Sequence, residues 1–229
     1  MKILAVETSS KVCSVALAED DKLIKEEILE DENTHSVKLM PLIDKLLSET
    51  NNKIEDVDLF AVDKGPGSFT GIRIGIATIK AFMDVTNKKG IGITSLETLA
   101  YNVKEDSIIC SLIDAKNENV YCGLFERKLN KISQLEELEF NNIDTFIEKV
   151  KIRNEKIIFV GDGALNHKDR IKENLKENAM FINDENLNKL NARNICLAAF
   201  NNNENSGDSN SLIPSYLRKS NAERLSLKR

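Results

Sequence analysis

Short apolar runs alternate with amphipathic stretches along the first half of this chain. The runs have the length and apolar content of buried β-strands, and the amphipathic stretches repeat at the helical spacing of three or four residues. This pattern predicts strands over 2–7, 12–18, 23–28, 59–62 and 91–94, and helices over 35–49, 70–84 and 95–101. A mixed sheet with helices packed on it is the architecture that this order favours.

The second half continues the alternation, although many Asn and Lys residues weaken the pattern. It predicts strands over 108–114, 120–126 and 157–161, and helices over 141–149, 164–178 and 192–200. Apart from Glu204, residues 201–211 are only Asn, Ser, Gly and Asp, which predicts a loop. Residues 214–217 are expected to dock as a strand. The expected division is an N-terminal lobe at 1–101, a C-terminal lobe at 102–217 and a charged tail at 218–229.

The stretch 64–80, KGPGSFTGIRIGIATIK, lies between a predicted strand and a predicted helix. Its glycines and Pro66 predict a tight turn, and Ser68 or Thr70 is suited to cap the helix. A glycine turn at a helix N-terminus presents backbone N–H groups to an anion. The stretch is therefore either a phosphate-binding loop or a tight turn into a closely packed helix. The loop residues concerned are Gly65, Gly67, Ser68 and Gly71.

The helices at 35–49 and 70–84 carry more apolar surface than one sheet face buries. Gly71 and Gly75 lie four residues apart, which predicts that another backbone approaches closely. A helix that is apolar nearly all round is buried on more than one side, and we expect a partner protein to supply the second side. The two helices are predicted to lie side by side and form a four-helix contact with a matching pair. The predicted interface residues are His35, Lys38, Leu39, Leu42, Ile72, Arg73, Gly75, Ile76 and Ile79.

Composition places the chain among globular proteins, with 41% hydrophobic and 30% charged residues in 229. The net charge of −5 gives no overall attraction for nucleic acid. The apolar run before Glu7 is too short for the core of a signal peptide, and no segment is long enough to span a membrane. The four cysteines have no paired spacing, so we expect buried, reduced thiols and a cytoplasmic location.

The sequence contains few residues and motifs that are typical of catalytic or metal-binding sites. His35 and His167 are the only histidines, and HxxxH, HExxH, the Walker lysine pattern and GxSxG do not occur. No catalytic residue, metal or cofactor is therefore expected. Acidic residues at predicted strand ends are the remaining candidates: they could hold a metal–nucleotide complex, or they could form turns and caps. These residues are Glu7, Asp63, Asp114 and Asp162.

Four segments resemble the TsaB family, formerly called YeaZ. They are ILAVETSSKVCSVAL, HSVKLMPLIDKLL, AVDKGPGSFTGIRIGIATIKAF and PSYLRKSNAER, and they occur in the family's order. The resemblance implies the α/β fold of the actin, sugar-kinase and heat-shock ATPase superfamily, with two lobes that each contain a five-stranded mixed sheet flanked by helices. It also implies that the glycine loop is a vestige of a phosphate-type loop.

The same resemblance implies a non-catalytic subunit of the bacterial complex that forms N6-threonylcarbamoyladenosine in tRNA, next to the anticodon. Catalysis would lie in the paralogue TsaD, with which the chain would form a heterodimer, and the ATPase TsaE would be the third member. A homodimer is expected when TsaD is absent, and tRNA contact only through the complex. Two departures are Glu7-Thr8-Ser9, where the superfamily has DTS, and the looser match over 127–205.

Two other functions remain open on the sequence. The first is a stand-alone nucleotide-binding ATPase or phosphotransferase that uses the glycine loop and the strand-end carboxylates. The second is a peptidase, which older family labels suggest, although no nucleophile, base or metal site supports it. An assay of the purified chain with ATP and magnesium separates the first from the binding subunit, and co-purification with TsaD tests the partnership.

Overall fold

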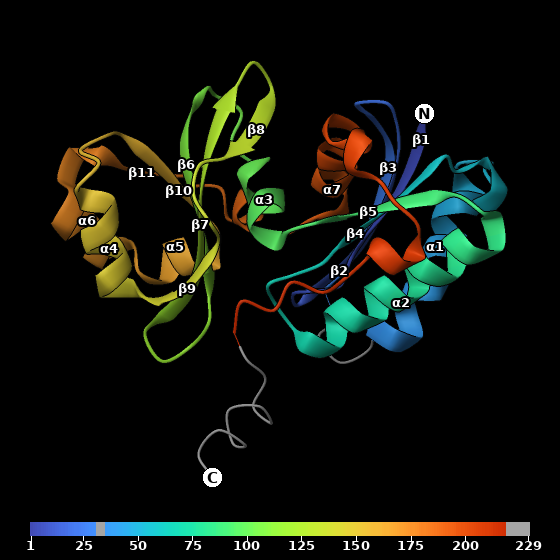
Figure 1. Cartoon of the computed structure of the whole chain (residues 1–229), viewed down its shortest axis with the longest axis horizontal. Coiled ribbons are helices and arrows are strands. Elements are labelled where there is room, and N and C mark those ends of the chain that lie inside the picture. The colour runs from blue at the N-terminus through green and yellow to red at the C-terminus, as the bar shows by residue number, and fades with distance from the viewer. Residues whose placement is uncertain (31–34, 219–229) are drawn as a thin grey trace, which may run out of the picture.

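The first of two sheets organises the N-terminal part of the chain (Figure 1). The computed structural model describes residues 1–30 and 35–218. Within them, β1 is antiparallel to β2 and parallel to β4, so the sheet is mixed, as predicted. Its order is β3-β2-β1-β4-β5. The strands are β1 (Lys2–Glu7), β2 (Val12–Glu19), β3 (Lys22–Glu30), β4 (Leu59–Asp63) and β5 (Lys89–Ile93).

Both faces of this first sheet are covered by helices, which explains why its central strands are apolar at nearly every position. Side chains alternate between the faces along each strand. Leu4 and Val6 lie under α1 (His35–Glu49) and α2 (Phe69–Thr86). Ile3 and Ala5 lie under α7 (Ala192–Asn201) on the opposite face. Figure 1 shows α1 and α2 side by side on one side of the sheet, as predicted.

The second sheet repeats the order of the first. Its order is β11-β10-β6-β7-β8, with β9 paired to the other end of β7. The strands β8 and β9 together occupy the place that β3 has in the first sheet, so the predicted five strand positions are filled by six strands. The strands are β6 (Ser107–Asp114), β7 (Asn119–Lys128), β8 (Lys131–Gln134), β9 (Glu139–Asn142), β10 (Ile157–Val160) and β11 (Ala179–Phe181).

The helices that follow the strands of this second sheet cover one of its faces. They are α4 (Ile143–Lys151), α5 (Asp162–Asn166) and α6 (Lys168–Leu175), so the helix predicted over 164–178 is divided at His167. Five short 3₁₀ helices complete the described secondary structure. They are η1 (Ile54–Asp56), η2 (Lys176–Asn178), η3 (Glu185–Asn188), η4 (Asn203–Asn205) and η5 (Ser209–Ser211).

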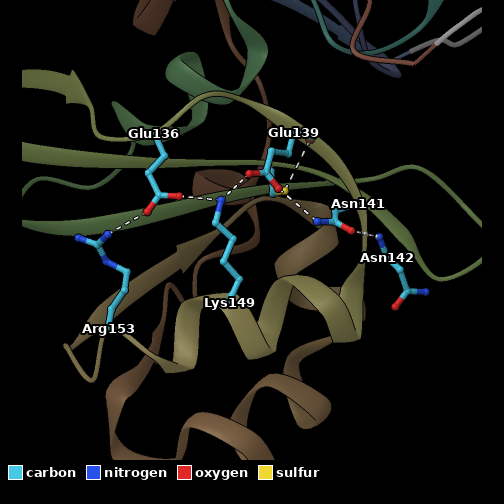
Figure 2. Close-up of polar contacts among 7 residues, drawn as sticks. Glu136, Glu139, Asn141, Asn142, Lys149 and Arg153 are labelled. Carbon is cyan, nitrogen blue, oxygen red and sulfur yellow. Dashed lines mark hydrogen bonds and ion pairs between the residues drawn. The ribbon is translucent and has the colours of Figure 1, made fainter.

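An ion-pair network fastens α4 to the connection between β8 and β9 (Figure 2). Lys149 pairs with Glu136 at 2.7 Å and also with Glu139, while Arg153 pairs with Glu136 at 2.9 Å. The hydrogen bonds from Glu136 and Glu139 raise the pKa of Lys149 above its usual range. Because these side chains are partly exposed, each pair stabilises the fold by no more than about 0.2–1 kcal/mol.

Two helices cross between the lobes: each packs on the sheet of the other half of the chain. The helix α3 (Ser95–Ala100) packs on the second sheet, where Leu96 and Leu99 join its core. The helix α7 comes from the second half of the chain but packs on the first sheet. Helix α3, before residue 101, thus packs with the second lobe, and α7, after residue 101, packs with the first. The physical reason is that each sheet needs a second apolar cover, which the other half of the chain supplies.

Several smaller expectations have clear outcomes in the described residues. All four cysteines are buried and free, as predicted. None of the helices within 1–30 and 35–218 combines the length and apolar character that a membrane crossing needs. The segment 214–217 docks without forming a strand: the N–H of Ser215 donates to the carbonyl oxygen of Lys64 at 2.7 Å. The predicted loop at 201–211 contains η4 and η5, and Gly207 forms a β-bridge with Gly90.

Buried asparagines join the two chain segments that cross between the lobes. The Asn102 side-chain oxygen accepts hydrogen bonds from Nδ2 of Asn194 at 2.7 Å and from Nδ2 of Asn191 at 3.2 Å. In the opposite direction, Asn102 Nδ2 donates to the carbonyl oxygen of Lys189 at 3.1 Å. All three asparagines are almost fully buried, so their hydrogen bonds are made without competition from water.

Replacing Asn102 by alanine should lower the free energy of unfolding by about 1–3 kcal/mol, because it leaves buried amide groups without partners. Chemical denaturation of the purified chain measures this change. The exposed Asn210, whose side chain makes no described hydrogen bond, supplies a matched control, and Asn210→Ala should alter stability by no more than about 0.5 kcal/mol. Equal effects of the two substitutions would contradict the contribution to folding stability that we assign to the buried asparagine hydrogen bonds.

Candidate functional site

Two backbone N–H groups of the glycine loop between β4 and α2 donate to acceptors within the chain. The N–H of Gly65 donates to Asp63 Oδ1 at 2.7 Å, and the N–H of Ser68 donates to the carbonyl oxygen of Ser9 at 2.7 Å. The Ser68 hydroxyl caps α2 by accepting from the N–H of Gly71 at 3.2 Å. The backbone N–H groups of Gly65, Ser68 and Gly71 are thus engaged within the fold.

Close packing explains the glycines of α2. A Cβ at Gly71 would collide with the carbonyl oxygen of Thr8, and one at Gly75 would meet the Thr8 hydroxyl and Val62. In return, Thr8 Oγ1 donates to the carbonyl oxygen of Gly71 at 2.8 Å. The approaching backbone that the glycines predicted is therefore the end of β1 in the same chain. Of the two alternatives for this stretch, the structure supports the tight turn into a closely packed helix.

Two of the four candidate carboxylates lie directly beneath this loop. Glu7 ends β1, Asp63 ends the adjacent parallel strand β4, and both side chains are fully buried. Glu7 Oε1 accepts from the N–H groups of Ser9 at 2.9 Å and Ser10 at 3.0 Å. Burial, and then the nearby Asp63, raise the pKa of Glu7 well above its usual range, and burial raises the pKa of Asp63.

The other two carboxylates meet at the corresponding place in the second lobe. Asp114 ends β6, Asp162 opens α5, and the N–H of Asp114 donates to Asp162 Oδ1 at 3.0 Å. Lys116 lies 3.0 Å from Asp114 Oδ2 as an ion pair. Burial raises the pKa of Asp162. Among the residues that the structure describes, no cluster of three or more His, Cys, Asp or Glu side chains is arranged to hold a metal ion.

A cleft of about 830 Å³ separates the two lobes beside these elements. The first lobe lines it with the turn after β1 and with the N-terminus of α2, and the second lobe lines it with Asp114, Lys116 and Asp162. Lys189 and Glu30 form an ion pair of 2.7 Å at its wall. The volume lies within the range of small-molecule pockets, but neither Glu7 nor Asp63 lines it.

Most of the apolar residues predicted to face a partner belong to the core. Leu39 of α1 and Ile72, Ile76 and Ile79 of α2 are buried between these helices and the first sheet. Gly75 faces Thr8, as described above, and Leu42 is half-buried against the same core. The prediction of an exposed stripe at these positions is therefore wrong, because the sheet already covers it.

Three predicted interface residues remain, His35 and Lys38 on α1 and Arg73 on α2, and their exposure to solvent differs. His35 is buried, and its Nε2 donates to the carbonyl oxygen of Ser10 at 2.9 Å. Lys38 of α1 and Arg73 of α2 are exposed. Arg73 Nε donates to the Tyr216 hydroxyl at 2.9 Å, and the Tyr216 ring stacks on Phe69 with ring centroids 4.6 Å apart.

The sequence interpretation missed the residues that do face outward from the helix pair. Val37 and Met40 of α1 are 69% and 50% exposed, and Ala77 and Ala81 of the neighbouring helix α2 are exposed as well. A signal for α1 was available, since Val37 and Met40 are apolar but fall outside the stripe that contains Leu39. We call Val37, Met40, Arg73, Ala77 and Ala81 the outer face.

Solved structures of other proteins share this architecture. A Pseudomonas aeruginosa protein described as similar to peptidase YEAZ has a TM-score of 0.79 at 22% identity, covering 95% of this chain and 99% of that one. The ROK hexokinase from Thermus thermophilus has a TM-score of 0.51 at 10% identity, covering 88% and 97%. Two lobes with the same strand order, joined around a cleft, define a protein of the actin, sugar-kinase and heat-shock ATPase fold class.

Sequence comparison is more specific. The model of the family described as TsaD, tRNA N6-adenosine threonylcarbamoyltransferase, matches residues 22–225. The tRNA threonylcarbamoyladenosine biosynthesis protein TsaB of Bacillus subtilis is 32% identical over 224 residues, which cover 97% of this chain and 96% of that protein. The chain belongs to the TsaB family of tRNA threonylcarbamoyladenosine biosynthesis proteins, within the wider TsaD family, as its motifs predicted.

The substitution Gly71→Ala tests the close packing of α2 on β1. Helix propensity alone would stabilise this variant by about 1 kcal/mol. The collision with the Thr8 carbonyl should reverse that sign and lower the free energy of unfolding by about 1–3 kcal/mol, because backbone has to move. Urea denaturation measures the change, and a variant as stable as the unsubstituted chain would contradict the packing argument.

Proposed function

We propose that this chain is a non-catalytic subunit of the bacterial complex that forms N6-threonylcarbamoyladenosine in tRNA next to the anticodon, and that it dimerises with and supports the catalytic TsaD subunit. The outer face of α1 and α2 is the observation that carries the proposal. Exposed apolar and small side chains on two neighbouring helices are suited to docking against other helices.

The hydrogen bonding of the glycine loop and the burial of Glu7 and Asp63 support a non-catalytic role. The N–H groups of Gly65 and Ser68 are engaged by Asp63 and Ser9 of the same chain. Glu7 and Asp63 are sealed beneath that loop and do not line the cleft. A nucleotide bound in the cleft would therefore not reach the carboxyl groups of Glu7 and Asp63.

Similarity to TsaD itself supports TsaD as the partner. The match to the TsaD family model spans both helices of the outer face, so a TsaD subunit of the same fold would present a corresponding pair. Two related subunits that meet through equivalent surfaces form a contact with approximate two-fold symmetry. The four helices would bury roughly 800 Å² on each partner, as is typical of specific complexes.

The remaining partners follow from the same proposal. The ATPase TsaE would be the third component, and a homodimer through the outer face would form when TsaD is absent. Contact with tRNA would occur only through the complex, since a net charge of −5 gives the chain no overall attraction for nucleic acid. The expected location is the cytoplasm.

Met40→Glu tests the outer face. It should weaken TsaD binding about tenfold or more, because an unpaired charge in an apolar contact costs more than about 1.4 kcal/mol. Calorimetric titration with purified TsaD measures the affinity. Met180, which is 46% exposed on β11 of the second lobe, provides the matched control, and Met180→Glu should bind as tightly as the unsubstituted chain. Equal affinities for both variants would place the interface elsewhere.

The cleft volume favours one second candidate, a stand-alone ATPase or phosphotransferase. Our proposal expects no useful turnover when the purified chain is incubated with ATP and magnesium. Release of inorganic phosphate measures this activity. A rate near the enzyme median of about 10 per second, abolished by Asp63→Asn, would establish the ATPase and overturn the non-catalytic role.

A further inference from the structure

The carboxyl groups of Glu7 and Asp63 meet where two adjacent parallel strands end. Val6 of β1 is paired with Val62 of β4, so the next residues along each strand, Glu7 and Asp63, lie at the same end of the sheet. Both side chains are 0% exposed. Two ionised carboxylates in such a place would repel each other without screening by water.

The hydrogen bonds around the pair leave one oxygen of Asp63 for Glu7. Asp63 Oδ1 accepts from the N–H of Gly65 and the Ser95 hydroxyl, both at 2.7 Å. Asp63 Oδ2 is buried and receives no bond from an N–H or a hydroxyl group of the chain. The Glu7 carboxyl group, equally buried at the end of the adjacent parallel strand, is the group placed to supply the missing donor. A bond between two carboxyl groups requires a proton on one of them.

The donors around Glu7 indicate which oxygen carries that proton. Glu7 Oε1 accepts the backbone N–H groups of Ser9 and Ser10 and lies 3.0 Å from the Ser9 hydroxyl, whereas the one hydrogen bond described for Oε2 is with that hydroxyl, at 3.1 Å. A hydroxyl oxygen is a poorer acceptor than a carbonyl oxygen, so the proton belongs on Oε2. Asp63, with two donors on Oδ1, then remains ionised.

Titratable groups from four elements are packed around the pair. From β2, Cys13 adds a thiol whose pKa burial and Glu7 raise to about 11. From α1, His35 donates to the Ser10 carbonyl oxygen. Lys64 follows β4 and extends over Gly92. From α3, Glu97 accepts a bond from Asn202 and has Lys64 as its charged neighbour.

We propose that Glu7 is protonated at neutral pH and donates a hydrogen bond to Asp63 Oδ2. The carboxyl pair then anchors the glycine loop and α3, and its contribution to folding stability depends on pH. The pair holds the loop through Gly65 and Ser9, and it holds the first residue of α3 through Ser95. The proposal concerns the stability of this chain, and it is independent of which partner the outer face binds.

The sign of the pH effect follows from a pKa that is higher in the folded chain than in the unfolded chain. Glu7 is fully protonated in both states below its usual pKa of about 4.3, so its contribution to stability is complete there. As the pH rises toward the raised pKa, folding requires uptake of a proton. The folding equilibrium constant then falls by up to about tenfold per pH unit, until the folded chain loses the proton as well.

Glu7→Gln is the decisive variant, because an amide retains the shape and hydrogen bonds of a protonated carboxyl at every pH. Its stability should exceed that of the unsubstituted chain at about pH 8, and should decline less steeply as pH rises. Urea denaturation from about pH 5 to about pH 9 measures both. Glu204→Gln, the same change at an exposed glutamate on η4, is the control and should leave the slope unchanged. Parallel curves for the Glu7→Gln variant and the unsubstituted chain would overturn the proposal.

Infrared spectroscopy keeps the test independent of whether that variant folds. The unsubstituted chain at neutral pH should show the C=O stretch of a protonated carboxyl group, shielded from exchange with D₂O. Labelling glutamate with ¹³C should shift this band, whereas labelling aspartate should not. Absence of a protonated glutamate at neutral pH would overturn the proposal. A band that shifts with labelled aspartate instead would place the proton on an aspartate and would overturn it as well.

Discussion

Contact between the first turns of α2 and the backbone at Thr8 is the constraint on which the first lobe depends. No side chain fits there, so Gly71 and Gly75 allow α2 to lie directly on the end of β1. Once the helix is seated, its rotation is fixed: Ile76 turns into the core, and Ala77, the next residue, is exposed. The core of the lobe and its outer face are therefore two results of one backbone contact.

The duplicated architecture gives equivalent strand ends different chemistry. Glu7 and Asp63 end β1 and β4, while Asp114 and Asp162 lie at the ends of β6 and β10, which hold the same positions in the second sheet. The glycine loop closes over the first pair, whereas the second pair lines the cleft beside Lys116. Of the two equivalent carboxylate pairs, one is thus covered by its own loop and the other is open to the cleft.

Sequence patterns predicted what depends on local periodicity and failed where packing between distant segments decides. The helix expected at 35–49 has these bounds, because its leucines recur regularly. The strands β8, β9 and β11 were missed, since they are short and lack an alternating apolar pattern. Periodicity also identifies which residues of α2 share a face, but not whether a sheet or a partner covers that face, which is why the predicted interface was largely core.

Buried polar groups connect the glycine loop to the junction of the lobes. Ser95 donates to Asp63 at the start of α3, and that helix ends two residues before Asn102, which bonds to Asn194 near the start of α7. Since α3 packs on the second sheet and α7 on the first, each lobe is held in part by the other half of the chain. An apolar contact alone tolerates sliding, whereas hydrogen bonds between buried groups are lost when geometry changes. These buried hydrogen bonds therefore limit how far the two lobes can move relative to each other.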